Sequence, residues 1–157
     1  MSRVAAAGVL LAGLLVAAVG CRGQPPLASP TATATTALVL VVLTAGQPTG
    51  RVAQPRAPGV TMARLFVRDV KNSSGQGLQF AVALEDTATP AHHVEVGNFS
   101  LYPSNHSGVF ALPLPAAAAD LARQGPTVLI VTMAPALAGT TLQPDVSVSL
   151  TAELTHP

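Results

Sequence analysis

Three of the four histidines in this 157-residue chain are the side chains best placed in the sequence for metal binding. His92 and His93 are adjacent, and His106 follows a short segment later. Imidazole is a common ligand of copper and zinc. If the pair lies in a turn, both rings could approach one ion together with His106 and a methionine, Met62 or Met133; if it lies in a strand, the rings point to opposite faces and cannot. The sequence leaves open a copper or zinc site at His92, His93 and His106, beside the simpler interpretation of solvated turn histidines.

Two other groups of residues contain catalytic side-chain types. Glu85 and Asp86 are adjacent at the end of a predicted strand, but carboxylates that share acid and base work must converge on a substrate from chosen positions. We therefore interpret them as an exposed turn. Ser104 and His106 have neither an acid nor a small-residue elbow of the hydrolase kind around them. No residue set predicts a reaction, and the sequence favours a protein that is not an enzyme.

The composition argues against nucleic acid as a partner. Charged residues make up 10% of the chain, aromatic residues 3%, and Trp is absent. Lys71 is the only lysine, and the basic residues form no cluster. A nucleic-acid surface needs a basic field and usually aromatic side chains for stacking. The chain has neither.

The first 20 residues have the layout of a secretory signal peptide, with Arg3 before an uncharged apolar run. The run ends in Ala18-Val19-Gly20-Cys21, which resembles the bacterial lipobox, although that motif usually has Leu where Ala18 stands. Cys21 is the only cysteine in the chain and falls where lipidation would require it. The resemblance implies a diacylglycerol on Cys21 and cleavage before it. An ordinary cleaved signal and an uncleaved anchor helix are the alternatives.

This leader implies an extracytoplasmic protein held on a membrane by lipid. Residues 21–36, the lipidated cysteine and a segment rich in Pro, Ala and Thr, cannot bury enough apolar surface to fold, and we expect them to be a tether. The domain is expected at 37–157. With one cysteine in the chain it has no internal disulfide and depends on its core.

Within the domain, apolar residues repeat with period two, which is typical of half-buried strands. The clearest examples are Leu78–Leu84 and Val146–Leu154. Turn-rich pieces separate the other candidate strands, which are Leu38–Leu43, Leu65–Val70, Val94–Tyr102, Val109–Leu114 and Thr127–Met133.

Pro115–Gln124 is predicted to be a short helix that crosses between sheets, and 44–62 a long irregular loop. These elements predict an all-β fold, an antiparallel Ig-like or jelly-roll-type sandwich of about seven strands with one crossover helix.

Part of the domain resembles a known family. Residues 64–134 are similar to the C-terminal β-sandwich domain that follows the dicopper domain in some tyrosinases and haemocyanin-like proteins. The matching pieces, in order, are Arg64–Val67, Gln79–Leu84, Val94–Tyr102, Val109–Leu114, the alanine-rich helix and Val128–Met133. The family's catalysis belongs to the preceding dicopper domain, to which nothing in this chain corresponds. The resemblance thus implies an accessory domain that covers, stabilises or scaffolds a partner.

Together these features predict a non-enzymatic, membrane-anchored lipoprotein. Its sandwich would bind a surface or periplasmic protein, and it would need no cofactor. The alternative is a lipoprotein that handles copper or zinc through His92, His93 and His106.

Overall fold

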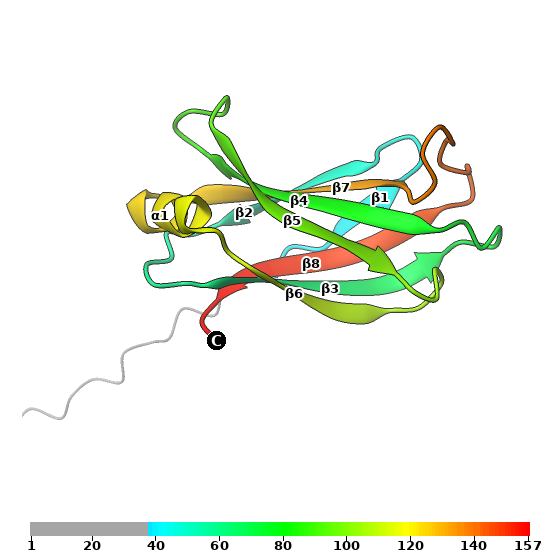
Figure 1. Ribbon diagram of the computed structural model, residues 1–157, viewed down its shortest axis with the longest axis horizontal. Coiled ribbons are helices and arrows are strands. Elements are labelled where there is room, and N and C mark those ends of the chain that lie inside the picture. Colours follow the sequence, from blue (N-terminus) through cyan, green and yellow to red (C-terminus); the bar gives the residue numbers. More distant parts are fainter. Residues whose placement is uncertain (1–37) are drawn as a thin grey trace, which may run out of the picture. The chain divides into compact units, whose positions relative to one another are not determined.

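The computed structural model describes residues 38–157, which form eight strands and one helix (Figure 1). The strands are β1 (Val41–Thr44), β2 (Thr49–Gln54), β3 (Met62–Lys71), β4 (Leu78–Asp86), β5 (His93–Leu101), β6 (Gly108–Pro113), β7 (Thr127–Pro135) and β8 (Ser147–Thr155). The helix is α1 (Ala116–Gln124), between β6 and β7.

The strands make two antiparallel sheets that pack face to face. Sheet A has the order β1-β8-β3-β6, and sheet B has the order β2-β7-β4-β5. Strand β1 pairs with β8, β2 with β7, β3 with β6 and β4 with β5. The chain therefore folds as one long hairpin rolled into two sheets, which is the strand order of a jelly roll. The predicted all-β sandwich is confirmed, and of the two proposed types the topology is the jelly roll.

All seven predicted strands are present, with ends shifted by a few residues, but the predicted loop 44–62 was wrong because it contains β2. This strand alternates regularly, with its inward positions at Gly50, Val52 and Gln54. Only one of the three carries a large apolar side chain, so the period-two pattern is hidden. A β-carbon at Gly50 would lie 2.5 Å from Cγ1 of Val41, so glycine is what allows β2 to approach β1 here.

Aliphatic and aromatic side chains from both sheets form one core. Phe80 and Phe99 of sheet B stack with ring centroids 4.8 Å apart, and Phe99 stacks on Phe110 of sheet A at 4.2 Å. The fourth phenylalanine, Phe66, faces away from this stack and lies under the guanidinium of Arg64. Aromatic contacts of this geometry add to the free energy gained by burial and fix the two sheets together at their β5–β6 side.

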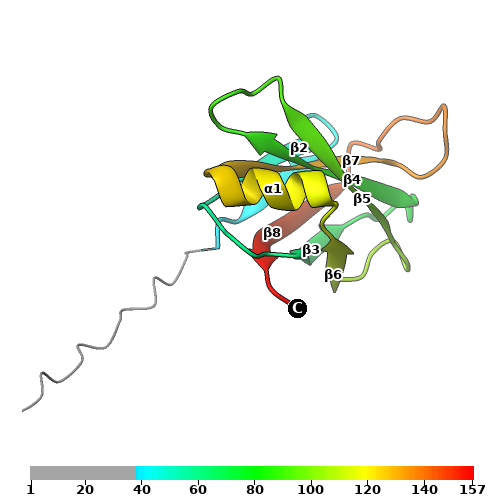
Figure 2. The same cartoon turned by 60° about the vertical axis from the view of Figure 1, so that its left-hand side comes forward.

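The helix closes one end of the sandwich, as predicted for the crossover between the sheets (Figure 2). Pro115 precedes its first turn, and Gly125 follows its last. The buried side of the helix consists of Ala118, Leu121 and Ala122. The two alanines on this face let the helix lie close to β4 and β5.

Because successive strands run in opposite directions, the connections separate into two groups (Figure 1). The helix end contains α1, the β2–β3 and β4–β5 connections, the start of β1 and the end of β8. The loop end contains the β1–β2, β3–β4, β5–β6 and β7–β8 connections, residues 45–48, 72–77, 102–107 and 136–146.

Candidate functional site

The structure separates the three predicted metal ligands. His92 lies in the β4–β5 connection and His93 begins β5, both at the helix end, whereas His106 lies in the β5–β6 loop at the loop end. At about 3.3 Å per residue, the length of β5 alone puts about 26 Å between His93 and the loop that holds His106. Nδ1 of His106 instead lies 2.8 Å from Oδ1 of Asn105. One ion cannot be shared by the three histidines in this fold.

The candidate methionines do not bring the histidines together either. Met133 is buried in the core, and Met62 begins β3. Among residues 38–157, no group of three or more His, Cys, Asp or Glu side chains is arranged to hold a metal ion. The helix end holds exposed histidines at His92, His93 and, after β8, His156.

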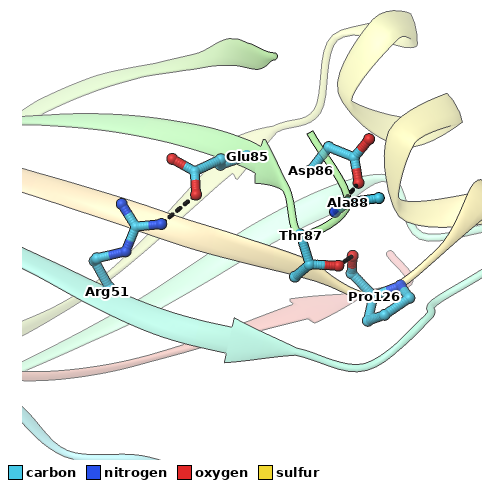
Figure 3. A network of polar contacts seen from close by, with 6 residues as sticks. All are labelled: Arg51, Glu85, Asp86, Thr87, Ala88 and Pro126. Atoms are coloured by element: carbon cyan, nitrogen blue, oxygen red, sulfur yellow. Dashed lines mark hydrogen bonds and ion pairs between the residues drawn. The ribbon is translucent and has the colours of Figure 1, made fainter. Parts of the chain in front are cut away.

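Glu85 is the one carboxylate that the fold buries, which corrects our interpretation of Glu85 and Asp86 as an exposed turn (Figure 3). Glu85 is only 7% exposed, although it lies on the outer face of sheet B. Its carboxylate forms an ion pair with Arg51 of β2. The register explains the contact: Arg51 pairs with Ile130 and Glu85 with Val128, so the guanidinium reaches diagonally across β7.

The two residues after Glu85 have structural roles in the turn shown in Figure 3. Oδ1 of Asp86 accepts a hydrogen bond from the backbone N–H of Ala88 at 2.9 Å, and the Thr87 hydroxyl donates to the carbonyl of Pro126 at 2.9 Å. Asp86, Thr87 and Pro126 also line a shallow hollow of about 250 Å³ beside α1. His93 of β5 lies opposite Glu85 in the β4–β5 register, but in the described part of the chain the bond of the Glu85 carboxylate is to Arg51, and we interpret the cluster as a support for the β4–β5 turn.

The loop end, by contrast, is organised by a polar network centred on Asn72, whose partners could not be predicted from the local pattern of a turn. Asn72 is buried, and its side-chain amide donates hydrogen bonds to the carbonyls of Gln76 and Ser104 at 2.8 and 3.0 Å. Its oxygen accepts hydrogen bonds from the hydroxyl of Ser74 and the backbone N–H of Gln76, both at 3.0 Å. One buried amide thus shapes the β3–β4 loop and joins it to the β5–β6 loop.

The same β3–β4 loop is bound to the β7–β8 loop. The side chain of Gln76 donates to the carbonyl of Thr141 at 2.8 Å and accepts from the backbone N–H of Gln143 at 3.0 Å. Asp145 accepts hydrogen bonds from the hydroxyl of Ser73 and the backbone N–H of Ser74. The hydrogen bond from the Ser73 hydroxyl is the main cause that lowers the pKa of Asp145 below its ordinary value.

On this connected frame, the β5–β6 loop presents an aromatic side chain to solvent. Tyr102, the only tyrosine of the chain, is 98% exposed, and the β7–β8 loop, on the other side of the β3–β4 loop, exposes Leu137 to 71%. The hydroxyl of Ser104 donates to the carbonyl of Gly75 at 3.2 Å, so it is engaged in the frame and does not form a nucleophile pair with His106. The loop end therefore combines exposed side chains at the loop tips with loops that hydrogen bonds hold in place.

Cys21, the predicted lipidation site, lies outside the described residues. Between residues 38 and 157, no helix combines the length and apolar character that crossing a bilayer requires. The sequence matches no protein-family model and no curated protein sequence.

Proposed function

We propose that this chain is a non-enzymatic lipoprotein, anchored outside the cytoplasm by lipid on Cys21, whose jelly-roll domain binds another protein through its loop end. The observation that carries the binding role is Tyr102. In a chain with 3% aromatic residues, one aromatic side chain is left 98% exposed on a loop that is hydrogen-bonded to the β3–β4 loop. Burying such a side chain in a partner gains apolar contact without first ordering the loop.

The position of Tyr102 supports this role. Tyrosine is among the residues that dominate binding energy at protein interfaces, because it offers a large apolar face and a hydroxyl. Loops gathered at one end of a β-sandwich are a common place for recognition, since the sheets fix their positions while their sequences vary. Tyr102 would form the apolar centre, and the polar atoms of residues 102–107 and of the adjoining β3–β4 loop its rim.

Sequence features support the remaining parts of the proposal. The apolar leader and Cys21 account for anchoring, and the likeness of residues 64–134 to an accessory domain of tyrosinases is compatible with a partner-binding role. That likeness stays a prediction. The wide separation of His106 from His92 and His93 weighs against the metal-handling alternative.

The binding role is tested by site-specific photocrosslinking in the native host. A photoreactive amino acid replaces Tyr102 in the full-length chain, and the matched control replaces Ala81, an exposed residue on the outer face of sheet B. We expect one reproducible protein adduct from position 102 that is absent from position 81. Affinity of the purified partner should fall about tenfold or more for Tyr102→Ala, with an unchanged melting temperature, and much less for Tyr102→Phe.

Two outcomes would contradict the proposal. Equal crosslinking from both positions would mean that the loop end has no special role. An unmodified sulfur on Cys21, seen in the mass of the mature chain, would remove the anchoring part and leave the binding part standing.

A further inference from the structure

The two outer faces of the sandwich differ in charge. Positions that face outward on β3 include Arg64, Arg68 and Lys71, as their pairing with the outward-facing residues of β8 shows. Two carboxylates are nearby: Glu153 lies 3.7 Å from Arg64, and Asp69 lies at the bulge between Arg68 and Lys71. Three positive and two negative charges leave this face of sheet A at +1.

The outer face of sheet B has the opposite sign. Its outward positions include Arg51 of β2, Glu85 of β4 and Glu95 of β5. One positive and two negative charges give −1 with His93 neutral, and Arg51 is already paired with Glu85. In the described part of the chain, neither Arg68 nor Lys71 has a carboxylate within 4 Å, so both cations of sheet A remain available.

The positive face is also the one with exposed aliphatic side chains. Val42 of β1 is 48% exposed and Val109 of β6 is 61% exposed, and both lie on the outer side of sheet A. Leu38, Val39 and Leu40, just before β1, are exposed as well. The pairing Val42–Ser149–Arg68 places aliphatic and cationic groups in one row across the sheet. We call this surface the β3 face, defined by Leu40, Val42, Arg64, Arg68, Lys71 and Val109.

A second copy of the chain does not suit the β3 face. A two-fold contact would place the same patch on both sides, and the cations of one copy would meet those of the other. An anionic bilayer suits it better, because basic residues are attracted to the negative surface while aliphatic side chains enter the headgroup region.

The segment between Cys21 and the domain is long enough for the β3 face to reach a bilayer. The chain leading from Cys21 enters the domain beside this face, at Leu38–Val42, and residues 22–36 can extend over about 50 Å at most. A lipid on Cys21 would hold the domain at a high effective concentration near the membrane, so that even a weak patch would be occupied.

We propose that the β3 face docks on the anionic surface of the membrane in which Cys21 is anchored. This inference rests on the lipid anchoring proposed above. It deepens that proposal by giving the domain an orientation: sheet A lies on the bilayer and sheet B faces away from it.

The test uses the lipidated full-length chain in vesicles. Because Cys21 is the only cysteine and its sulfur would carry the lipid, a new cysteine is the only free thiol. Val42→Cys is labelled with an environment-sensitive fluorophore, and Ala81→Cys on sheet B is the matched control. Vesicles contain either a phosphatidylglycerol–phosphatidylcholine mixture or phosphatidylcholine alone, with a quencher in the acyl chains.

We expect a blue shift and quenching at position 42 in the phosphatidylglycerol vesicles, and neither at position 81. The signal should fall in phosphatidylcholine alone and in about 0.5 M salt, because both conditions remove most of the electrostatic attraction between the cations and the bilayer. Replacing Arg64, Arg68 and Lys71 together by glutamine should lower the docked-to-undocked ratio about tenfold or more. A comparison of the melting temperatures of the triple variant and the wild type distinguishes this loss of docking from unfolding.

The outcomes distinguish the two proposals. A lipidated chain with equal signals at 42 and 81, or with a signal at 42 that needs another protein rather than lipid, overturns membrane docking and leaves the lipoprotein intact. A mature chain without lipid, seen by mass, overturns the anchoring and this inference with it.

Discussion

The side chain of Gln54 makes hydrogen bonds to β8 where no strand pairs with it on that side. Removing this side chain is the sharpest test of how the two sheets are joined. Strand β1 pairs with β8 only as far as Val41 opposite Leu150, although β8 continues to Thr155. Beyond that point the amide of Gln54, from β2 in the other sheet, donates to the carbonyl of Ala152 at 3.1 Å and accepts from the N–H of Leu154 at 3.2 Å. Gln54 is 6% exposed, so water does not readily take its place.

Gln54→Met keeps the size of the side chain and removes both hydrogen bonds. It leaves one buried carbonyl and one N–H without their partner, at a cost of about 1–3 kcal/mol for each group. The hollow of about 90 Å³ beside Gln54 could admit a water to one of them, which places the expected loss of unfolding free energy at about 2–4 kcal/mol. Urea unfolding of the purified protein measures it.

Gln76→Met is the matched control. Gln76 also accepts one backbone hydrogen bond and donates another, but it does so at the surface of the loop end, where water can replace it. We expect a loss below about 1 kcal/mol. If the two variants lose the same free energy, or if Gln54→Met loses less than about 0.5 kcal/mol, burial does not govern this bridge and the reasoning fails.

Three other perturbations follow from the packing and the polar contacts. Gly50→Ala should lower the unfolding free energy by about 1–3 kcal/mol, because the new β-carbon would lie 2.5 Å from a methyl of β1; urea unfolding checks it. The lowered pKa of Asp145 means that its stabilising contribution is complete above its ordinary pKa and is lost as pH falls through the folded-state value. The melting-temperature difference between wild type and Asp145→Asn should therefore be constant from pH 7 to pH 5 and shrink below about pH 4, and Ser73→Ala should reduce it. In copper or zinc titrations, His92→Ala and His106→Ala should have independent effects, since the two residues lie at opposite ends of the domain; loss of one common site in both variants would contradict the fold.

Sequence periodicity predicts those strands whose inward positions all carry apolar side chains. In β4, Leu78, Phe80, Val82 and Leu84 alternate with exposed or half-buried residues, and the strand is found where it is predicted. In β2 the inward positions hold a glycine, a valine and an amide whose partners lie about a hundred residues away, so local pattern carries little information. Proline and glycine at its flanks then favour a loop, although an edge strand tolerates them.

The polar sites were also harder to predict, because their partners lie far away in the sequence. The burial of Glu85 depends on Arg51 reaching across β7, a contact set by the registers of two strand pairs. The Asn72 network depends on loops that meet only after the hairpin is rolled up. By contrast, the separation of His92 from His106 could have been inferred from the intervening strand, because a residue before β5 and one after it must lie at opposite ends.

The direction of the strands also connects the anchoring and the binding proposals. The chain enters the domain at the helix end, so each odd-numbered strand runs toward the loop end and each even-numbered strand returns. Every connection that follows an odd-numbered strand, including the one that carries Tyr102, must therefore lie opposite the entry of the tether. If the β3 face rests on the bilayer, the sandwich lies along the membrane with Tyr102 at its free end, where a neighbouring surface protein could reach it from the side. If the face does not dock, the tether alone determines how far the loop end extends, and a partner could meet it at a range of heights. Crosslinking from Tyr102 in the Arg64, Arg68 and Lys71 triple variant would therefore show whether orientation on the membrane matters for binding the partner.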